Sequence, residues 1–146
     1  MQIKMTNFNN QVKTWPVLGL TLLLSAFVAF STSAQDKGKK LTAPETAKKL
    51  KAAVPADDEN ISAGKALYAK HCKSCHGAGG KGDGPKAAQL EKECGDFTSA
   101  GFKTLTDGEV YWMTTEGNDP MPTFKKKTTD EERWQITHYV RTLGKK

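Results

Sequence analysis

The sequence predicts an all-α domain of three to five short helices joined by loops. Two tetrapeptides, at residues 106–109 (TDGE) and 129–132 (TDEE), match the capping box, in which a threonine and a glutamate satisfy free N–H groups of a first helical turn. After the second box, apolar residues recur at the spacing of one helix face: Ile136, Tyr139, Val140 and Leu143. Residues 77–85 (GAGGKGDGP) contain too many glycines for a regular element. We therefore expect every residue after Asn60 to lie in a helix or a loop.

The first 34 residues of the 146-residue chain are predicted to be a signal peptide. Residues 1–14 carry Lys4 and Lys13 and no acidic residue, residues 17–30 form an apolar run, and residues 31–34 (STSA) offer small side chains for cleavage after Ala34. The run is shorter than the ~20 residues that cross a bilayer, so an uncleaved membrane anchor is the lesser alternative. We therefore expect an exported, periplasmic protein.

Residues 35–60 are rich in lysine, alanine and proline, and we expect a flexible tether that buries little, with a short helix at residues 45–51. Residues 61–146 then form the folded domain. Its first helix is expected to begin with Asn60 or Ser62 as the cap and to run to about Lys70. Gly64 and Tyr68 share one face of that helix, and the glycine is either merely tolerated or marks a close crossing by another helix.

The remaining elements follow from local signals. A short helix is expected at residues 86–93, and the first capping box opens a helix at residues 107–115 that Gly117 ends. Residues 118–124 are expected to be extended, because a residue that precedes proline is disfavoured in helical geometry. The last helix is expected to end at Gly144.

Residues 72–76 (CKSCH) are the strongest chemical signal in the chain. In a C-x-x-C-H motif, Cys72 and Cys75 can each add across a vinyl group of a haem, and His76 can ligate the iron. A zinc site would usually need two more ligands at paired spacing, and the remaining candidates do not pair: Cys94, His71 and His138. The motif therefore predicts one covalent haem c.

The second axial ligand is predicted from the donors that remain in the mature chain. His71 lies on the attachment side, His138 is expected to face solvent, and Met113 falls within a helix where core packing is its expected role. Met121 lies between two prolines in a loop, 45 residues after His76, which is far enough to pass over the ring. Ligation by His76 and Met121 would fill both axial positions, which suits electron transfer rather than substrate binding.

The ordered set of motifs resembles the class I c-type cytochromes, small monohaem electron carriers, over about residues 62–143. The residues that carry this resemblance are Gly64, Tyr68, the 72–76 motif, Gly84, Pro85, Met121, Pro122, Phe124 and Tyr139. It implies the cytochrome c fold, with short helices and loops around one haem and with the first and last helices crossing at Gly64 and Tyr139. It also implies that the Pro85 carbonyl accepts a hydrogen bond from Nδ1 of His76 and so orients the ligand.

The expected function is that of an exported electron-transfer protein, not an enzyme, which carries single electrons between redox proteins such as an oxidase, reductase or dehydrogenase. A dedicated electron-transfer subunit of a dehydrogenase or reductase complex is the main alternative, followed by a haem enzyme or gas sensor and, more distantly, a zinc or thiol-redox protein. The formal charge of +6 falls to +4 without Lys4 and Lys13, which suits docking on an acidic protein and is no nucleic-acid signature. A membrane partner is expected only if the leader stays uncleaved.

Two features near the expected haem can each be interpreted in two ways. Cys94 is either a small, partly buried residue or a thiol for an intermolecular disulfide. Residues 125–127 (KKK) either surround an exposed haem edge or form an ordinary solvated face. The expected pocket wall, which is also the expected core, consists of Leu90, Phe97, Phe102, Leu105 and Trp112.

Overall fold

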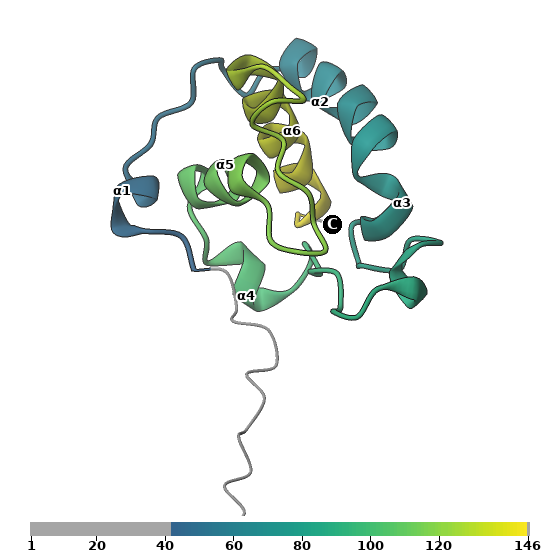
Figure 1. Ribbon diagram of the computed structural model, residues 1–146. Helices are drawn as coiled ribbons and strands as arrows, with labels where there is room; N and C mark the ends of the chain where they lie inside the picture. Colours follow the sequence, from purple (N-terminus) through teal and green to yellow (C-terminus); the bar gives the residue numbers. More distant parts are fainter. Residues whose placement is uncertain (1–41, 146) are drawn as a thin grey trace, which may run out of the picture. The chain divides into compact units, whose positions relative to one another are not determined.

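The computed structural model describes residues 42–145, so the predicted signal peptide and the first seven residues of the expected tether lie outside the described residues. Figure 1 shows this part as helices and loops. Its elements are α1 (Glu45–Lys48), α2 (Asp58–His71), α3 (Lys73–His76), a 3₁₀ turn η1 (Ala87–Gln89), α4 (Ala100–Lys103), α5 (Asp107–Glu116) and α6 (Asp130–Leu143). The all-α prediction is confirmed, with six α-helices in the described range rather than three to five.

Helices α2 and α6 cross closely, and the crossing depends on Gly64 (Figure 1). A Cβ atom placed on Gly64 would lie 2.5 Å from the carbonyl carbon of Gln135 and 3.1 Å from Cβ of Tyr139. The Tyr68 and Tyr139 rings meet beside this point, with their centroids 5.2 Å apart. The structure therefore favours the close-crossing interpretation of Gly64, at the two positions that the family resemblance implies.

Both capping boxes form as predicted, whereas the start of α2 differs. The backbone N–H of Thr106 donates to Glu109 (2.7 Å), and that of Thr129 donates to Glu132 (2.7 Å), while each threonine hydroxyl accepts the reciprocal bond. Helix α2 begins at Asp58 because the side chain of Asp57 accepts a hydrogen bond from the backbone N–H of Asn60 (2.9 Å). The prediction of a cap at Asn60 or Ser62 was therefore wrong by about one helical turn.

The hydrophobic core lies between α2, α5 and α6 and continues toward the 72–76 motif. Its buried members are Tyr68, Val110, Ile136, Val140 and Leu143. The partly buried residues that pack on them are Leu67, Cys72, Phe97, Phe102, Leu105 and Tyr139. The apolar stripe predicted for the last helix therefore faces the core, and the first cysteine of the motif touches that same core.

Residues 42–60, which were expected to form part of a flexible tether, bury more of their surface than predicted. Ala43 and Ala47 are 4% and 2% exposed, and the Ala47 carbonyl lies against Gly108 of α5, where only a glycine leaves room for it. Farther along, the Val54 carbonyl oxygen lies 3.0 Å from Nε2 of His138. His138 is 5% exposed, so its predicted solvent-facing position was also wrong. Small alanine side chains allow this segment to lie close to the helices despite its lysine-rich composition.

Two loop predictions also need correction. Residues 118–121 form a tight turn, not an extended segment, because Asn118 and Met121 exchange backbone hydrogen bonds of 2.9 and 2.8 Å. The helix expected at residues 86–93 shrinks to the single 3₁₀ turn η1. In both places local backbone hydrogen bonds decided the conformation, and the side-chain pattern gave no sign of them.

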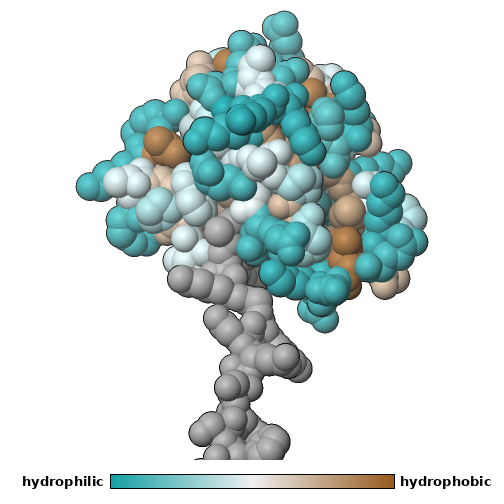
Figure 2. All heavy atoms as spheres, viewed as in Figure 1, coloured by the Kyte–Doolittle hydropathy of each residue, from teal (hydrophilic) through white to brown (hydrophobic). Residues whose placement is uncertain are grey.

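The described surface is mainly hydrophilic in the view of Figure 2, with scattered hydrophobic patches. Among residues 42–145, Leu50 is a large hydrophobic residue that is exposed, at 41%. Lys125, Lys126 and Lys127 are all exposed. Among the helices of the described range, none is long and apolar enough to cross a membrane.

Candidate haem-binding site

The end of α2 and the short helix α3 place the three functional side chains of the motif together. Cys72 N–H donates to the Tyr68 carbonyl at 2.9 Å, so the chain is still helical as it enters the motif. Within the motif, the Cys72 carbonyl accepts from Cys75 N–H (3.1 Å) and from His76 N–H (2.9 Å). Residues three and four positions apart share one helix face, so both thiols and the imidazole face the same side of one turn.

The glycine-rich loop folds back along this turn and fixes its backbone. Gly82 N–H donates to the His76 carbonyl (3.0 Å), and Gly84 N–H donates to the Cys75 carbonyl (3.0 Å). A Cβ atom on Gly84 would lie 2.5 Å from the Ser74 carbonyl oxygen, so a side chain does not fit there. Tyr68 closes the other side by donating its hydroxyl to the Gly77 carbonyl at 2.6 Å. The turn formed by residues 72–76 is thus held by the glycine-rich loop on one side and by Tyr68 on the other.

His76 is oriented by Gly95 and Phe97. Its Nδ1 lies 3.4 Å from the Gly95 carbonyl oxygen, and its ring stacks on that of Phe97 with the centroids 4.6 Å apart. A carbonyl oxygen can only accept, so Nδ1 carries the hydrogen and leaves the lone pair of Nε2 free. Burial lowers the pKa of His76, which favours the neutral imidazole that binds metals.

The resemblance implied that the Pro85 carbonyl accepts the hydrogen bond from Nδ1. In the structure the acceptor is the Gly95 carbonyl. The residues on either side of Pro85 are bonded to the motif backbone, Gly84 to Cys75 and Lys86 to Ser74, while the loop through Gly95 reaches the ring. The carbonyl of Gly95 is held in place because Phe97 N–H donates to the Gly80 carbonyl at 2.7 Å. A short spacing between His76 and Pro85 was the one sign of this in the sequence.

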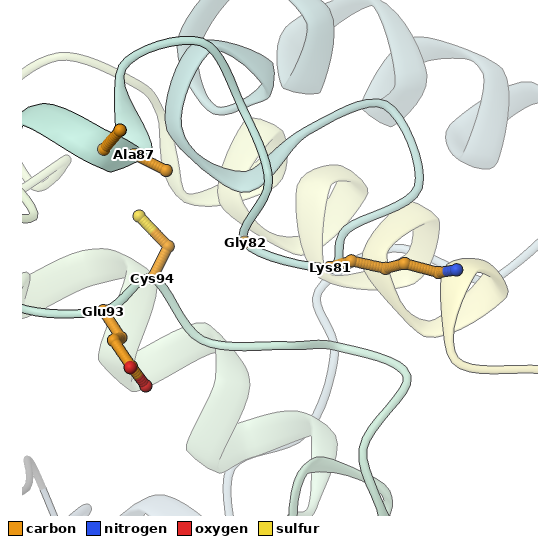
Figure 3. Close-up of a pocket in the computed structure, with 6 residues that line it drawn as sticks. Lys81, Gly82, Ala87, Glu93 and Cys94 are labelled. Atoms are coloured by element: carbon orange, nitrogen blue, oxygen red, sulfur yellow. The ribbon is translucent and has the colours of Figure 1, made fainter.

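The cysteines differ in their surroundings. Burial raises the pKa of Cys72 to about 12. Burial also raises the pKa of Cys94, with Cys75 as a further cause, so this third cysteine lies beside the attachment motif. It is partly buried and points into a shallow pocket toward Ala87, as Figure 3 shows. Its partial burial agrees with the simpler of the two interpretations, and no motif indicated that it lies near Cys75.

The turn that carries Met121 is attached to the end of α5. The Thr115 carbonyl accepts hydrogen bonds from the hydroxyl of Thr123 (2.6 Å) and from Phe124 N–H (3.2 Å). Gly117 lies directly against the returning backbone, since a Cβ atom there would be 2.6 Å from the carbonyl carbon of Pro122. Met121 itself is partly buried. The loop is therefore held firmly at its base.

The other possible iron ligands of the described residues lie in helices. Met113 is partly buried within α5, and the ring of His71 lies edge-on to the Phe124 ring at 5.7 Å. Nε2 of His138 is engaged with the Val54 carbonyl. Ligation of the iron by Met121 stays a prediction.

Comparison with known proteins decides the family. The family model for cytochrome c matches residues 61–144 of the chain. The chain belongs to the cytochrome c family. This cytochrome is similar to a chain in the structure of the Kuenenia stuttgartiensis reducing HAO-like protein complex Kustc0457/Kustc0458, with 36% identity and a TM-score of 0.58 over 71% of this cytochrome and 51% of that chain.

A second solved structure, the KustC0563 c-type cytochrome, is 30% identical, with a TM-score of 0.48 over 55% of this cytochrome and 95% of that chain. No curated protein matches this cytochrome. This cytochrome thus spans about half the length of the first of the two matched chains.

The side chains of the site fit the covalent haem c that membership of the family implies. Cys72 and Cys75 would hold the ring, and neutral His76 would ligate its iron, which supplies one-electron chemistry when the group is bound. Phe97, Phe102 and Leu105 extend the core up to this site, while Leu90 and Trp112 are partly buried. This cytochrome therefore has the attachment residues, the candidate iron ligand and the apolar wall that a covalent haem c needs.

Proposed function

We propose that this cytochrome is an exported monohaem carrier that passes single electrons between respiratory redox proteins, with His76 and Met121 as the axial ligands. The observation that carries the proposal is the helical backbone from Cys72 to His76, which puts Cys75 and His76 three and four positions after Cys72. The sequence contains three cysteines and one C-x-x-C-H motif, which supports a single haem.

The structure supports Met121 over Met113 through the loop that carries it. Met121 lies outside the helices, in a turn fixed to Thr115 and Gly117 at its base, and a loop can pass over the ring. Met113 is held within α5. Rigid placement of both ligands keeps the geometry similar in the two oxidation states, which favours rapid electron exchange.

Electron transfer can be separated from catalysis and gas sensing by ligand binding. We expect the purified protein to give one reversible one-electron wave in voltammetry and no spectral change when the reduced form meets carbon monoxide, because both axial positions are filled. Rapid binding of carbon monoxide at neutral pH would contradict the proposal and favour a haem enzyme or sensor.

Export rests on the sequence of residues 1–34, which lie outside the described residues. Intact mass measurement of the protein from a periplasmic extract tests it, with Gln35 as the expected first residue. A full-length, membrane-bound protein would favour the anchor instead.

A second candidate is a dedicated electron-transfer subunit of an enzyme complex. The match to the chain from the HAO-like complex covers about 104 residues of this cytochrome, whereas the family model covers residues 61–144. The longer match must include residues before the family domain, where residues 42–57 pack on α5 and α6. Purification from the native membrane or periplasm decides between the two, because a stoichiometric redox partner supports the subunit and a free monomer supports the carrier.

A further inference from the structure

Arg133 of α6 is buried and makes several contacts with one loop. Its side chain is 4% exposed, and its guanidinium donates to the carbonyl oxygens of Thr128 (2.6 Å) and Lys125 (3.4 Å). It also pairs with Asp130, and its Cζ lies 5.5 Å from the centroid of the Tyr111 ring. One side chain thus joins α5, α6 and the loop between them.

The segment that Arg133 holds is the return path of the Met121 turn. Phe124 is 4% exposed, and its backbone N–H and that of Lys125 both donate to the Thr115 carbonyl at 3.2 Å. Thr128 N–H then donates to the Phe124 carbonyl at 3.1 Å. Residues 124–128 therefore form a compact bracket that starts three residues after Met121, and Arg133 closes it from the core side.

Stability alone is a poor explanation for a buried arginine here. Nε of Arg133 is buried and has no hydrogen-bond partner among the described residues. A buried donor without a partner opposes folding, and well-packed apolar residues often replace buried charges without loss of stability. The hydrogen bonds that the guanidinium does make are directed at the carbonyls of the bracket, which points to a role in fixing that segment.

We propose that Arg133 is a positioning residue for Met121, acting through the residue 124–128 bracket; this inference rests on the proposed ligation of the iron by Met121. One guanidinium nitrogen, Nη1, donates to the Lys125 and Thr128 carbonyls while Nη2 pairs with Asp130, and this two-sided hold restrains the turn that presents the methionine sulfur. When the bracket loosens, the sulfur spends less time on the iron, and an added ligand displaces it at lower concentration.

Arg141 provides a matched control on the same helix. It donates to the carbonyl oxygens of Phe102 (3.4 Å) and Leu105, and it forms an ion pair with Asp107 at 2.6 Å. Its Cζ lies 5.3 Å from the centroid of the Phe102 ring. The same kinds of contact are thus made to residues 102–107, away from the Met121 turn in sequence.

The test is displacement of Met121 by imidazole in the oxidised holoprotein, followed by the weak far-red absorption band of a methionine–ferric iron bond. Arg133→Lys keeps the charge but offers a single nitrogen, which cannot reach the two carbonyls and Asp130 together. We expect it to lower the half-displacing imidazole concentration about tenfold, the effect of losing one buried charge-assisted hydrogen bond. Arg141→Lys is expected to leave that concentration within about twofold while it lowers the resistance to denaturant.

The outcomes separate the inference from the function on which it rests. An unchanged imidazole titration in Arg133→Lys overturns the inference, and so does an equal shift in Arg141→Lys, because both would show that the contact is not specific to Met121. Absence of the far-red band in the wild type overturns Met121 ligation itself, and the inference with it. If Arg133→Lys yields no folded holoprotein, Tyr111→Phe removes only a hydroxyl that contacts the guanidinium at 3.3 Å, and a smaller shift in the same direction supports the inference while no shift overturns it.

Discussion

The crossing of α2 and α6 makes Gly64→Ala the most informative test of the fold. The added Cβ atom would lie 2.5 Å from the carbonyl carbon of Gln135, about 1 Å short of the ~3.5 Å of ordinary carbon–carbon contact. The obstacle is backbone, so the helices themselves must separate. Overpacking typically costs about 1–3 kcal/mol, and a backbone obstacle puts this site at the upper end. The better helix propensity of alanine recovers about 1 kcal/mol, which leaves a net loss of about 2 kcal/mol.

Thermal unfolding of the holoprotein, followed by circular dichroism, measures this loss. For a domain of this size, it corresponds to a melting temperature roughly 8–16 °C lower. Gly101→Ala in α4 is the control, because a Cβ atom there meets nothing within 4 Å and the variant should be as stable as the wild type or slightly more so. A Gly64→Ala protein within about 0.5 kcal/mol of the wild type would refute the close crossing.

The remaining predictions concern α6, the N-terminal segment and the third cysteine. Thr129→Ala removes the acceptor for Glu132 N–H and should lower the free energy of unfolding by about 1 kcal/mol in denaturant titrations, with an unchanged haem spectrum. Ala47→Leu puts a large side chain where the residue is 2% exposed and should cost about 1–3 kcal/mol in the same assay, whereas a loosely attached tether would tolerate it. Because burial raises the pKa of Cys94, its alkylation by iodoacetamide should be slower at pH 7 than that of free cysteine and should accelerate only at higher pH; equal rates at pH 7 would contradict this.

The features that the sequence predicted well are those with a local cause. A capping box needs only four consecutive residues, and both boxes form with the expected partners. The stripe of α6 needs only helical spacing, and Ile136, Val140 and Leu143 are buried as expected. The attachment motif is also local, since residues three and four positions after Cys72 lie on the same helix face as Cys72.

The features that the sequence predicted poorly depend on contacts between distant segments. Gly95 accepts from His76 across 19 positions, and Val54 contacts His138 across 84, which no spacing rule anticipates. The segment that contains Ala43 and Ala47 is buried because Ala47 packs on Gly108, which has no side chain. The composition of the segment gave no sign of this contact, so it predicted little burial. The Met121 turn was expected to be extended because proline geometry was considered without the hydrogen bonds to Asn118.

The identity of the second axial ligand is the central claim, and one pair of variants tests it directly. The oxidised wild-type protein should show the far-red band of a methionine–iron bond. Met121→Ala should abolish that band, and Met113→Ala should retain it, with the covalent haem present in both. Loss of the band in Met113→Ala and its retention in Met121→Ala would contradict the account.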